Sequence, residues 1–228
     1  MMNHEAVQPG DAIHPGKPIL VDRYGPGARI NHWITAASLI LLALSGLALF
    51  HPSLFFLTGL FGGGQATRTI HPWIGVVLFV SFYIFFFQLW RANLWTRTDF
   101  AWLSRIGDML AGHEDRLPEL GKYNAGQKFI FWAMTALILV LIVSGVLIWD
   151  QYFGEATAVE TKRYAVLTHA VAAVLIICVF ILHVYAGIWT RGTLRAMTRG
   201  SVTGGWAWKH HRKWLRQLAG QKKVGPAE

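Results

Sequence analysis

Two histidines in an apolar stretch of the chain, His169 and His183, have the residue type and spacing that point most directly to chemistry. They lie fourteen positions apart within residues 164–190, which contain no charged side chain. At about 100° per residue, this spacing places the imidazoles within about 40° of one helix face and about 21 Å apart along the axis. Ionisable side chains are costly inside a bilayer and usually serve a function there. One helix thus offers two metal ligands at two membrane depths.

Four charge-free stretches predict that the chain crosses a membrane four times. They are residues 33–50, 71–90, 129–149 and 164–190, and they approach or exceed the roughly 20 residues that cross about 30 Å of hydrocarbon. Residues 28–31 can add a helical turn before the first. We expect an all-α integral membrane protein with a single membrane domain. It comprises an N-terminal arm (1–27), a four-transmembrane-helix bundle (28–190) and a basic tail (191–228).

The distribution of basic residues predicts the orientation, because Lys and Arg are retained on the cytoplasmic side. The arm, the segment between the second and third spans, and the tail are rich in them, whereas the opposite loops contain only Arg68, Lys162 and Arg163. Both termini are therefore expected to be cytoplasmic. The net charge of +9 is then a topology signal with some contact to anionic membrane lipid, and no nucleic-acid partner is expected.

This topology gives the remaining intramembrane histidines a depth. His71 opens the second span near the outer face, level with His169, and His32 opens the first span near the inner face, level with His183. A single histidine at a span end is usually an interfacial residue, but two matched depths favour ligation. Two axial imidazoles suit the iron of an electron-transferring haem. Cys178 is the only cysteine, which excludes a Cys-x-x-Cys-His attachment site, so two non-covalent haem b groups are expected.

The other histidines receive no ligand role. His51 follows the first span and is predicted to be a loop residue, and His4, His14 and His113 are expected to be solvated. His210 and His211 belong to a basic run in the tail that we interpret as a solvated or lipid-facing surface.

Small residues lie within the spans where a macrocycle would need space. Ser45-Gly46 and Ser144-Gly145 fall in the first and third spans, and Gly75 and Gly187 follow His71 and His183 by one helical turn. Clearance for a macrocycle and ordinary close packing of membrane helices are both consistent with this pattern.

The segment between the second and third spans has an amphipathic part and a polar part. Phe100, Leu103, Ile106 and Leu110 recur at helical spacing, so residues 99–111 are predicted to form a short helix on the membrane interface. Residues 121–128 then lead into the third span, with Asn124 as a plausible N-cap.

Several of these motifs resemble one family, the gamma, or cytochrome b, subunits of respiratory membrane-bound formate dehydrogenases. The resemblance covers residues 22–218. The motifs are Gly-Lys-Tyr-Asn-Ala-Gly-Gln-Lys at 121–128, Ile-His-Pro at 70–72, Leu-Ile-Val-Ser-Gly-Val-Leu-Ile-Trp at 141–149 and Trp-x-x-Lys-His-His at 206–211. The first twenty residues have no obvious counterpart in the family.

The resemblance implies a site for each cofactor. The outer haem is implied to bind His71 and His169, and the inner haem His32 and His183, in agreement with the depths above. A quinone, menaquinone or ubiquinone, is implied to bind beside the inner haem. Its implied residues are Asn124, Gly126 and His183, with Gln127 as a neighbour.

The resemblance also implies a redox function shared with partner subunits. Formate would be oxidised by a molybdenum or tungsten alpha subunit, so this chain has no catalytic residue for that step. An iron–sulfur beta subunit would pass electrons to the outer haem, and quinone would be reduced near the cytoplasmic face of a bacterial inner (plasma) membrane. Each electron would move against the membrane potential at about 2.3 kcal/mol per 100 mV.

Three other functions fit parts of the pattern. A cytochrome b subunit of a nickel–iron hydrogenase, or of a related molybdoenzyme such as thiosulfate reductase, would also use bis-histidine haems, but without an Asn-Ala-Gly-Gln motif. A membrane metal transporter would bind ions transiently, yet the four spans contain no carboxylate. A structural anchor without a cofactor would leave four costly histidines unexplained.

Overall fold

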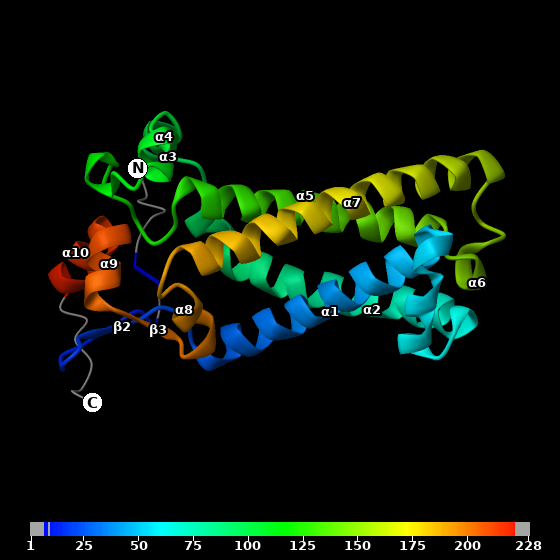
Figure 1. Ribbon diagram of the computed structural model, residues 1–228, viewed down its shortest axis with the longest axis horizontal. Coiled ribbons are helices and arrows are strands. Elements are labelled where there is room, and N and C mark those ends of the chain that lie inside the picture. The colour runs from blue at the N-terminus through cyan, green and yellow to red at the C-terminus, as the bar shows by residue number, and fades with distance from the viewer. Residues whose placement is uncertain (1–6, 9, 222–228) are drawn as a thin grey trace. The chain divides into compact units, whose positions relative to one another are not determined.

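The computed structural model describes residues 7, 8 and 10–221, which are mostly helical (Figure 1). The chain divides into two compact units. We call Asn31–Phe86 with Trp132–His183 the bundle unit, and Met1–Ile30, Phe87–Phe131 and Val184–Glu228 the sheet unit.

Four long apolar helices confirm the four predicted membrane spans. They are α1 (Pro26–Phe50), α2 (Gly64–Leu89), α5 (Ala125–Leu147) and α7 (Val159–Trp189). Each helix begins before its charge-free stretch, because Arg29, Arg68, Lys128 and Arg163 lie within the first turns. Long basic side chains tolerate a helix end, where their aliphatic stems pack on apolar surface and their charged groups reach polar partners.

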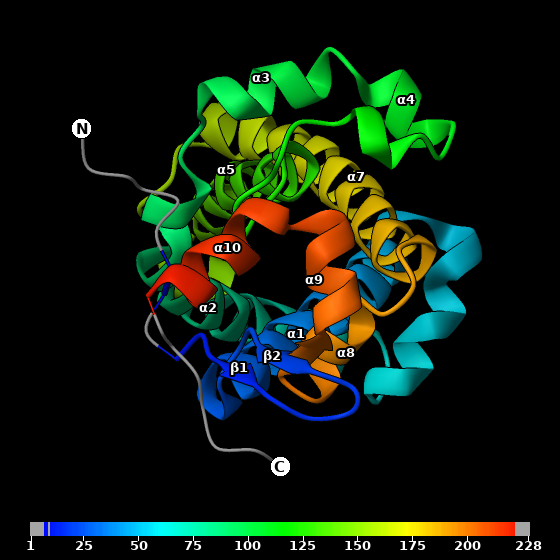
Figure 2. The ribbon, with the colours of Figure 1, turned by 90° about the vertical axis from the view of Figure 1, so that its left-hand side faces the viewer.

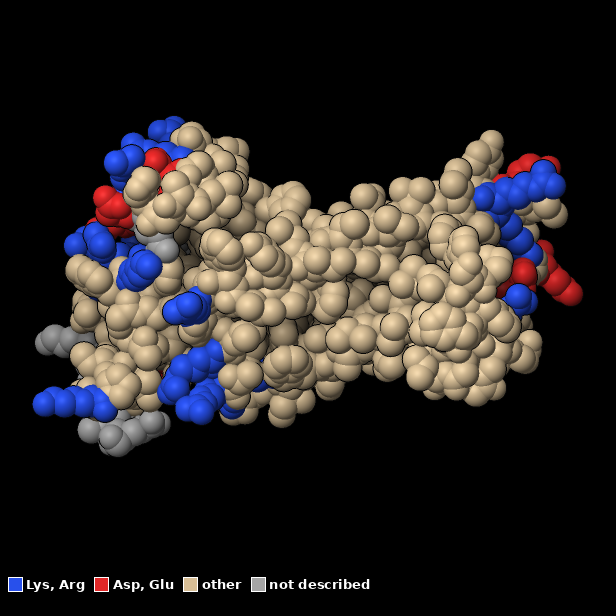
Figure 3. All heavy atoms as spheres, in the orientation of Figure 1, with Lys and Arg blue, Asp and Glu red and all other residues tan. Residues whose placement is uncertain are grey.

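Inside the bundle unit, each long helix is joined to its neighbours by polar or aromatic contacts. The Asn31 amide of α1 donates to the Ser81 carbonyl of α2 at 2.8 Å, and the Tyr83 hydroxyl of α2 donates to the Thr135 carbonyl of α5 at 3.2 Å. Such bonds matter in a membrane, where polar groups have no water as an alternative partner. The charged side chains of this unit lie towards one end of it, and the rest of its visible surface is uncharged (Figure 3).

The sheet unit contains a small antiparallel sheet that the sequence did not predict. Its order is β1 (Ile13–His14), β2 (Leu20–Asp22) and β3 (Ser201–Thr203). The tail adds α8 (Leu194–Thr198), α9 (Gly204–His210) and α10 (Arg212–Gly220), seen with the sheet in Figure 2. Val21, Val202, Trp214 and Leu218 are fully buried. The arm and the tail, expected to be flanking segments, thus share one hydrophobic core.

The predicted interfacial helix is present as two shorter helices, α3 (Arg97–Leu103) and α4 (Ile106–Leu110). The chain leaves helical geometry at Arg105, after the Ser104 hydroxyl has bonded to the Ala101 carbonyl. Serine competes with the helical backbone in this way. Phe100 and Leu110 are exposed, as an apolar face against a membrane requires.

The remaining helical segments are short. They are η1 (Pro52–Phe61), η2 (Trp90–Asn93), η3 (Glu114–Arg116) and α6 (Asp150–Phe153).

Candidate metal centres

The bundle unit brings together the first predicted pair of histidines. His71 of α2 and His169 of α7 face each other with ring centroids 6.3 Å apart and ring planes 65° from parallel. Both side chains are half-buried. Histidines from the second and fourth spans therefore meet at one point.

The second predicted pair has the same spacing. His32 of α1 and His183 of α7 have ring centroids 6.3 Å apart and an interplanar angle of 51°. The His32 ring packs edge-on against Trp33 at 5.2 Å and Phe85 at 6.4 Å. His32 is half-buried, and His183 is accessible.

Both spacings fit one metal ion held between two imidazoles. Metal–nitrogen bonds of about 2 Å and a distance of about 1.1 Å from each nitrogen to its ring centre sum to about 6 Å. Each pair supplies two protein ligands, the number taken by a haem iron with both axial positions filled. In the described part of the chain, no three His, Cys, Asp or Glu side chains gather where they could hold a metal ion.

The two Ser-Gly pairs contact the His71–His169 pair in matching ways. The Ser45 hydroxyl lies 2.7 Å from His71 Nδ1, and the Ser144 hydroxyl lies 3.0 Å from His169 Nδ1. A Cβ added at the following glycine, Gly46 or Gly145, would lie 3.4 Å from Cε1 of the same histidine. Each glycine thus lies beside an imidazole, at a distance where an added Cβ would be in ordinary van der Waals contact with the ring.

Among the described residues, a Cβ added at either of the other two small residues would meet no histidine. A Cβ at Gly75 would meet nothing within 4 Å, and one at Gly187 would lie 3.8 Å from Leu194. Neither observation favours macrocycle clearance over packing at these two positions.

The residues predicted for quinone binding form the N-terminus of α5. Asn124 and Gln127 make a reciprocal cap: Asn124 Oδ1 accepts from the Gln127 backbone N–H at 2.8 Å, and Gln127 Oε1 accepts from the Asn124 N–H at 3.0 Å. The predicted N-cap role of Asn124 is confirmed, and Gln127 has a capping role as well. A Cβ at Gly126 would lie 3.4 Å from Asn124 Oδ1 and 3.7 Å from the Trp102 ring.

A buried ion pair follows in the same helix. Lys128 Nζ lies 2.7 Å from Asp99 Oδ2 of α3 and donates to the Leu94 carbonyl at 3.1 Å. The same carboxylate caps α3 by accepting from the Thr96 N–H at 2.7 Å. The start of α5 is thus tied to α3 inside the sheet unit.

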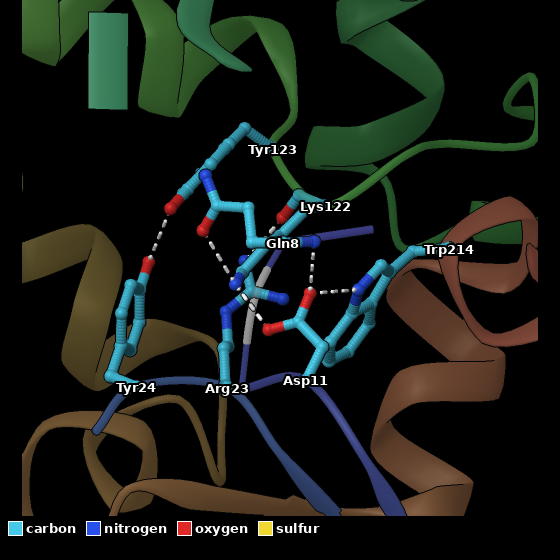
Figure 4. A network of polar contacts seen from close by, with 7 residues as sticks. All are labelled: Gln8, Asp11, Arg23, Tyr24, Lys122, Tyr123 and Trp214. Atoms are coloured by element: carbon cyan, nitrogen blue, oxygen red, sulfur yellow. Dashed lines mark hydrogen bonds and ion pairs between the residues drawn. The ribbon is translucent and has the colours of Figure 1, made fainter. Parts of the chain in front are cut away.

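A second buried network in the sheet unit was missed from the sequence (Figure 4). Asp11 accepts from Lys122 Nζ at 2.5 Å and from Trp214 Nε1 at 3.0 Å. The Arg23 guanidinium donates to the Lys122 carbonyl and lies 5.1 to 5.7 Å from four aromatic ring centres. The arm, residues 121–128 and the tail meet here, and the bonded residues lie up to 203 positions apart, so no local sequence pattern indicates the network.

His211 corrects the interpretation of the basic tail run as a surface. It is 1 % exposed, and its Nδ1 lies 2.7 Å from the Gly121 carbonyl. Burial, with the nearby Arg23 charge, lowers the pKa of the imidazole well below its usual value. The ring is therefore neutral, and Nδ1 donates to the carbonyl. The tail folds inward because the apolar side chains of Trp214 and Leu218 on α10 become fully buried there.

The other histidines have varied surroundings. His51 caps η1 by accepting from the Ser53 N–H at 3.2 Å, in agreement with a loop role. His113 is exposed as predicted, whereas His14 is half-buried and lies 2.6 Å from Asp22 Oδ2. His210 packs beside Trp206 with ring centroids 5.3 Å apart. His4 lies outside the described residues.

Comparison with known proteins identifies the family of the chain. Residues 23–200 match the model of the prokaryotic cytochrome b561 family, and the chain belongs to that family.

The resemblance to formate dehydrogenase cytochrome subunits is also confirmed. The chain is 44 % identical over 196 residues to the cytochrome b556(fdo) subunit of formate dehydrogenase from Escherichia coli (strain K12), covering 86 % of this chain and 92 % of that protein. It is 38 % identical over 190 residues to the nitrate-inducible cytochrome b556(Fdn) subunit of the same strain, covering 83 % and 88 %. A cytochrome b556 subunit from Haemophilus influenzae is 33 % identical over 195 residues, covering 86 % and 82 %.

Proposed function

We propose that this chain is the dihaem b cytochrome subunit of a formate dehydrogenase. In this proposal it receives electrons from an extracytoplasmic iron–sulfur subunit and delivers them to a quinone near the cytoplasmic face. The observation that carries the proposal is the presence of two histidine pairs with the same 6.3 Å ring spacing on three of the four long apolar helices. The named relatives support formate dehydrogenase over the hydrogenase alternative.

The residues present fit two haem b groups. His71 with His169 would hold one, and His32 with His183 the other, and the groups would supply one-electron carriers at two depths of the membrane. Two histidines at each site suit a haem that carries electrons rather than one that binds small molecules. The side chains provide orientation: Ser45 and Ser144 fix the first pair, and the aromatic rings of Trp33 and Phe85 flank His32.

For the quinone, the proposed residues are Asn124, Gly126, Gln127 and His183. The Asn124 Oδ1 is used in the helix cap, so its amide Nδ2–H is the group suited to donate a hydrogen bond to a quinone carbonyl. Gln127 would act indirectly, because its side chain holds the Asn124 backbone. Gly126 lies beside this cap, where an added Cβ would be in ordinary van der Waals contact with the Asn124 oxygen.

The orientation proposed is that of a multi-pass protein of a bacterial inner membrane with cytoplasmic N- and C-termini. Formate oxidation would occur in a molybdenum or tungsten subunit, and protons for the quinone would come from the cytoplasm. Electron transfer inward against the membrane potential would then conserve energy, about 2.3 kcal/mol per electron per 100 mV.

The experiment that tests this function is replacement of His183 by alanine in the complex. Because this imidazole is assigned to one haem and to the quinone site, His183→Ala should lose one of two b haems together with formate-driven quinone reduction. The haem of His71 and His169 should remain.

His51→Ala is the control, since His51 is a histidine of the bundle unit whose ring caps η1. It should keep both haems and normal quinone reduction. A His183→Ala protein with two haems and undiminished quinol formation would refute the ligand assignment.

A further inference from the structure

The hydroxyls of Ser45 and Ser144 each donate their proton to a backbone carbonyl of their own helix. Ser45 Oγ donates to the Leu41 carbonyl one turn earlier in α1 at 2.7 Å, and Ser144 Oγ donates to the Val140 carbonyl in α5 at 2.6 Å. A hydroxyl has one proton to donate and two lone pairs to accept with. Each serine must therefore act as the acceptor in its contact with histidine.

The direction of these bonds fixes the protonation of two imidazoles. His71 Nδ1 and His169 Nδ1 lie 2.7 Å and 3.0 Å from the serine oxygens, so each must carry the proton that it donates. In a neutral imidazole the other nitrogen, Nε2, then has a free lone pair. Both rings are thus held in the form that binds a metal through Nε2.

The same arrangement occurs twice on different helices. Ser45-Gly46 of α1 holds a histidine of α2, and Ser144-Gly145 of α5 holds a histidine of α7, with serine at Nδ1 and glycine against Cε1 in each case. The His32–His183 pair differs. His32 Nδ1 is buried and has no hydrogen-bond partner within the described residues.

We propose that Ser45 and Ser144 are positioning residues that lower the redox potential of the haem held by His71 and His169 relative to the haem held by His32 and His183. An acceptor on the N–H of a ligating imidazole raises the basicity of the ligand. A more basic ligand stabilises ferric over ferrous iron, which lowers the potential.

The consequence is a direction for electron flow. A lower potential at the pair assigned to the outer side makes transfer to the other pair favourable, and this gain opposes the cost of moving an electron against the membrane potential. The inference rests on the proposed function, since it requires a haem at each pair.

Redox titration of the purified complex, followed by the haem absorption bands, tests this assignment. Ser45→Ala and Ser144→Ala should each raise one of the two midpoint potentials, the double variant should raise it further, and the other potential should stay unchanged. Ser38→Ala is the matched control, because Ser38 is also a buried serine of α1 and makes no hydrogen bond to a histidine in the described part of the chain. It should shift neither potential.

Two further measurements keep the outcomes distinct. Haem content is determined first by pyridine haemochrome, and an absence of haem in the wild-type protein would refute the proposed function itself. Repeating Ser45→Ala in a His183→Ala background, which should contain only the His71–His169 haem, assigns the shifted potential to that pair.

The serine assignment is overturned if two haems are present and both alanine variants keep wild-type potentials. If Ser45→Ala or Ser144→Ala instead loses the haem, the matching variant, Ser45→Thr or Ser144→Thr, decides the matter because threonine keeps the hydroxyl. Wild-type haem content and potential in the threonine variant support the assignment, and a loss as large as that in the alanine variant refutes it.

Discussion

Replacing Asp11 by asparagine tests whether the N-terminal arm stabilises the folded sheet unit. The Asp11 carboxylate is 3 % exposed and accepts from Lys122 Nζ at 2.5 Å, Trp214 Nε1 at 3.0 Å and the Gln8 N–H at 3.0 Å. Asp11→Asn keeps the shape but removes the negative charge. The Lys122 ammonium, also 3 % exposed, would lose its carboxylate partner.

The magnitude follows from burial. Removing one partner of a buried ion pair costs about 3–5 kcal/mol, because the remaining charge is left uncompensated. Lys122 Nζ retains a 2.8 Å bond to Gln8 Oε1, and asparagine retains one oxygen, so we expect about 3 kcal/mol, the lower end of this range. A loss of about 3 kcal/mol corresponds to a roughly hundredfold increase in the population of the opened state.

Amide hydrogen exchange in detergent measures this population directly. The backbone amides of β2 and β3, which pair in the sheet, should exchange about a hundredfold faster in Asp11→Asn when exchange is limited by the opening equilibrium. Asp22→Asn is the control, since its carboxylate contacts His14 at 2.6 Å but its side chain is 43 % exposed. An exposed pair contributes about 1 kcal/mol or less. Equal acceleration in the two variants, or less than about tenfold in Asp11→Asn, would contradict the assignment of a buried pair.

Two more predictions concern the sheet unit. The pKa of His211 in the folded protein lies well below the usual value of 6.5, so the unfolded chain takes up a proton first as the pH falls. The contribution of neutral His211 to the free energy of unfolding should be fully present above about pH 6.5 and should decrease below it. For one group the decrease is at most about 1.4 kcal/mol per pH unit. His211→Asn, measured by hydrogen exchange between pH 5 and 7.5, should remove this part of the slope, and an unchanged slope would refute it. Gly200→Ala should destabilise the unit by more than about 1 kcal/mol, since Gly200 has φ +86° and a Cβ there would lie 2.6 Å from the Tyr24 carbonyl oxygen. Gly205→Ala, in a helix with open space, is its control, and similar thermal shifts for both variants would show that the Gly200 geometry is not required.

The membrane spans and the histidine pairs were predictable because both follow from strong local rules. Absence of charge over about 20 residues identifies a membrane helix, and helical geometry then fixes the depth of each histidine. The start of each helix was predicted too late. A basic residue such as Lys128 was excluded from the charge-free stretch that follows it. It nevertheless lies inside the helix, because Asp99, distant in the sequence, neutralises its charge.

The sheet unit was not predictable, because it depends on contacts between distant segments. Strands of two or three residues have no measurable alternation, and β2 pairs with β3 about 180 positions later. Trp214 and Leu218 lie at helical spacing and could have indicated a buried face on α10. The basic residues around them made that segment resemble a surface, and His211 was misassigned for the same reason.

The positions of the serines were predictable from the sequence, but their contacts were not. The sequence shows Ser-Gly pairs in two spans, but macrocycle clearance and close helix packing give the same pattern. The distances between each serine oxygen and a histidine on the neighbouring helix instead reveal a third role, a hydrogen bond to the imidazole.

The most direct test of the central claim is a dithionite-reduced minus oxidised spectrum of the purified subunit, with haem counted per chain by pyridine haemochrome. Two histidine pairs, each with the spacing of a bis-imidazole iron site, predict two b haems per chain. One haem would contradict the assignment of one pair, and a chain purified without any haem would contradict the account as a whole.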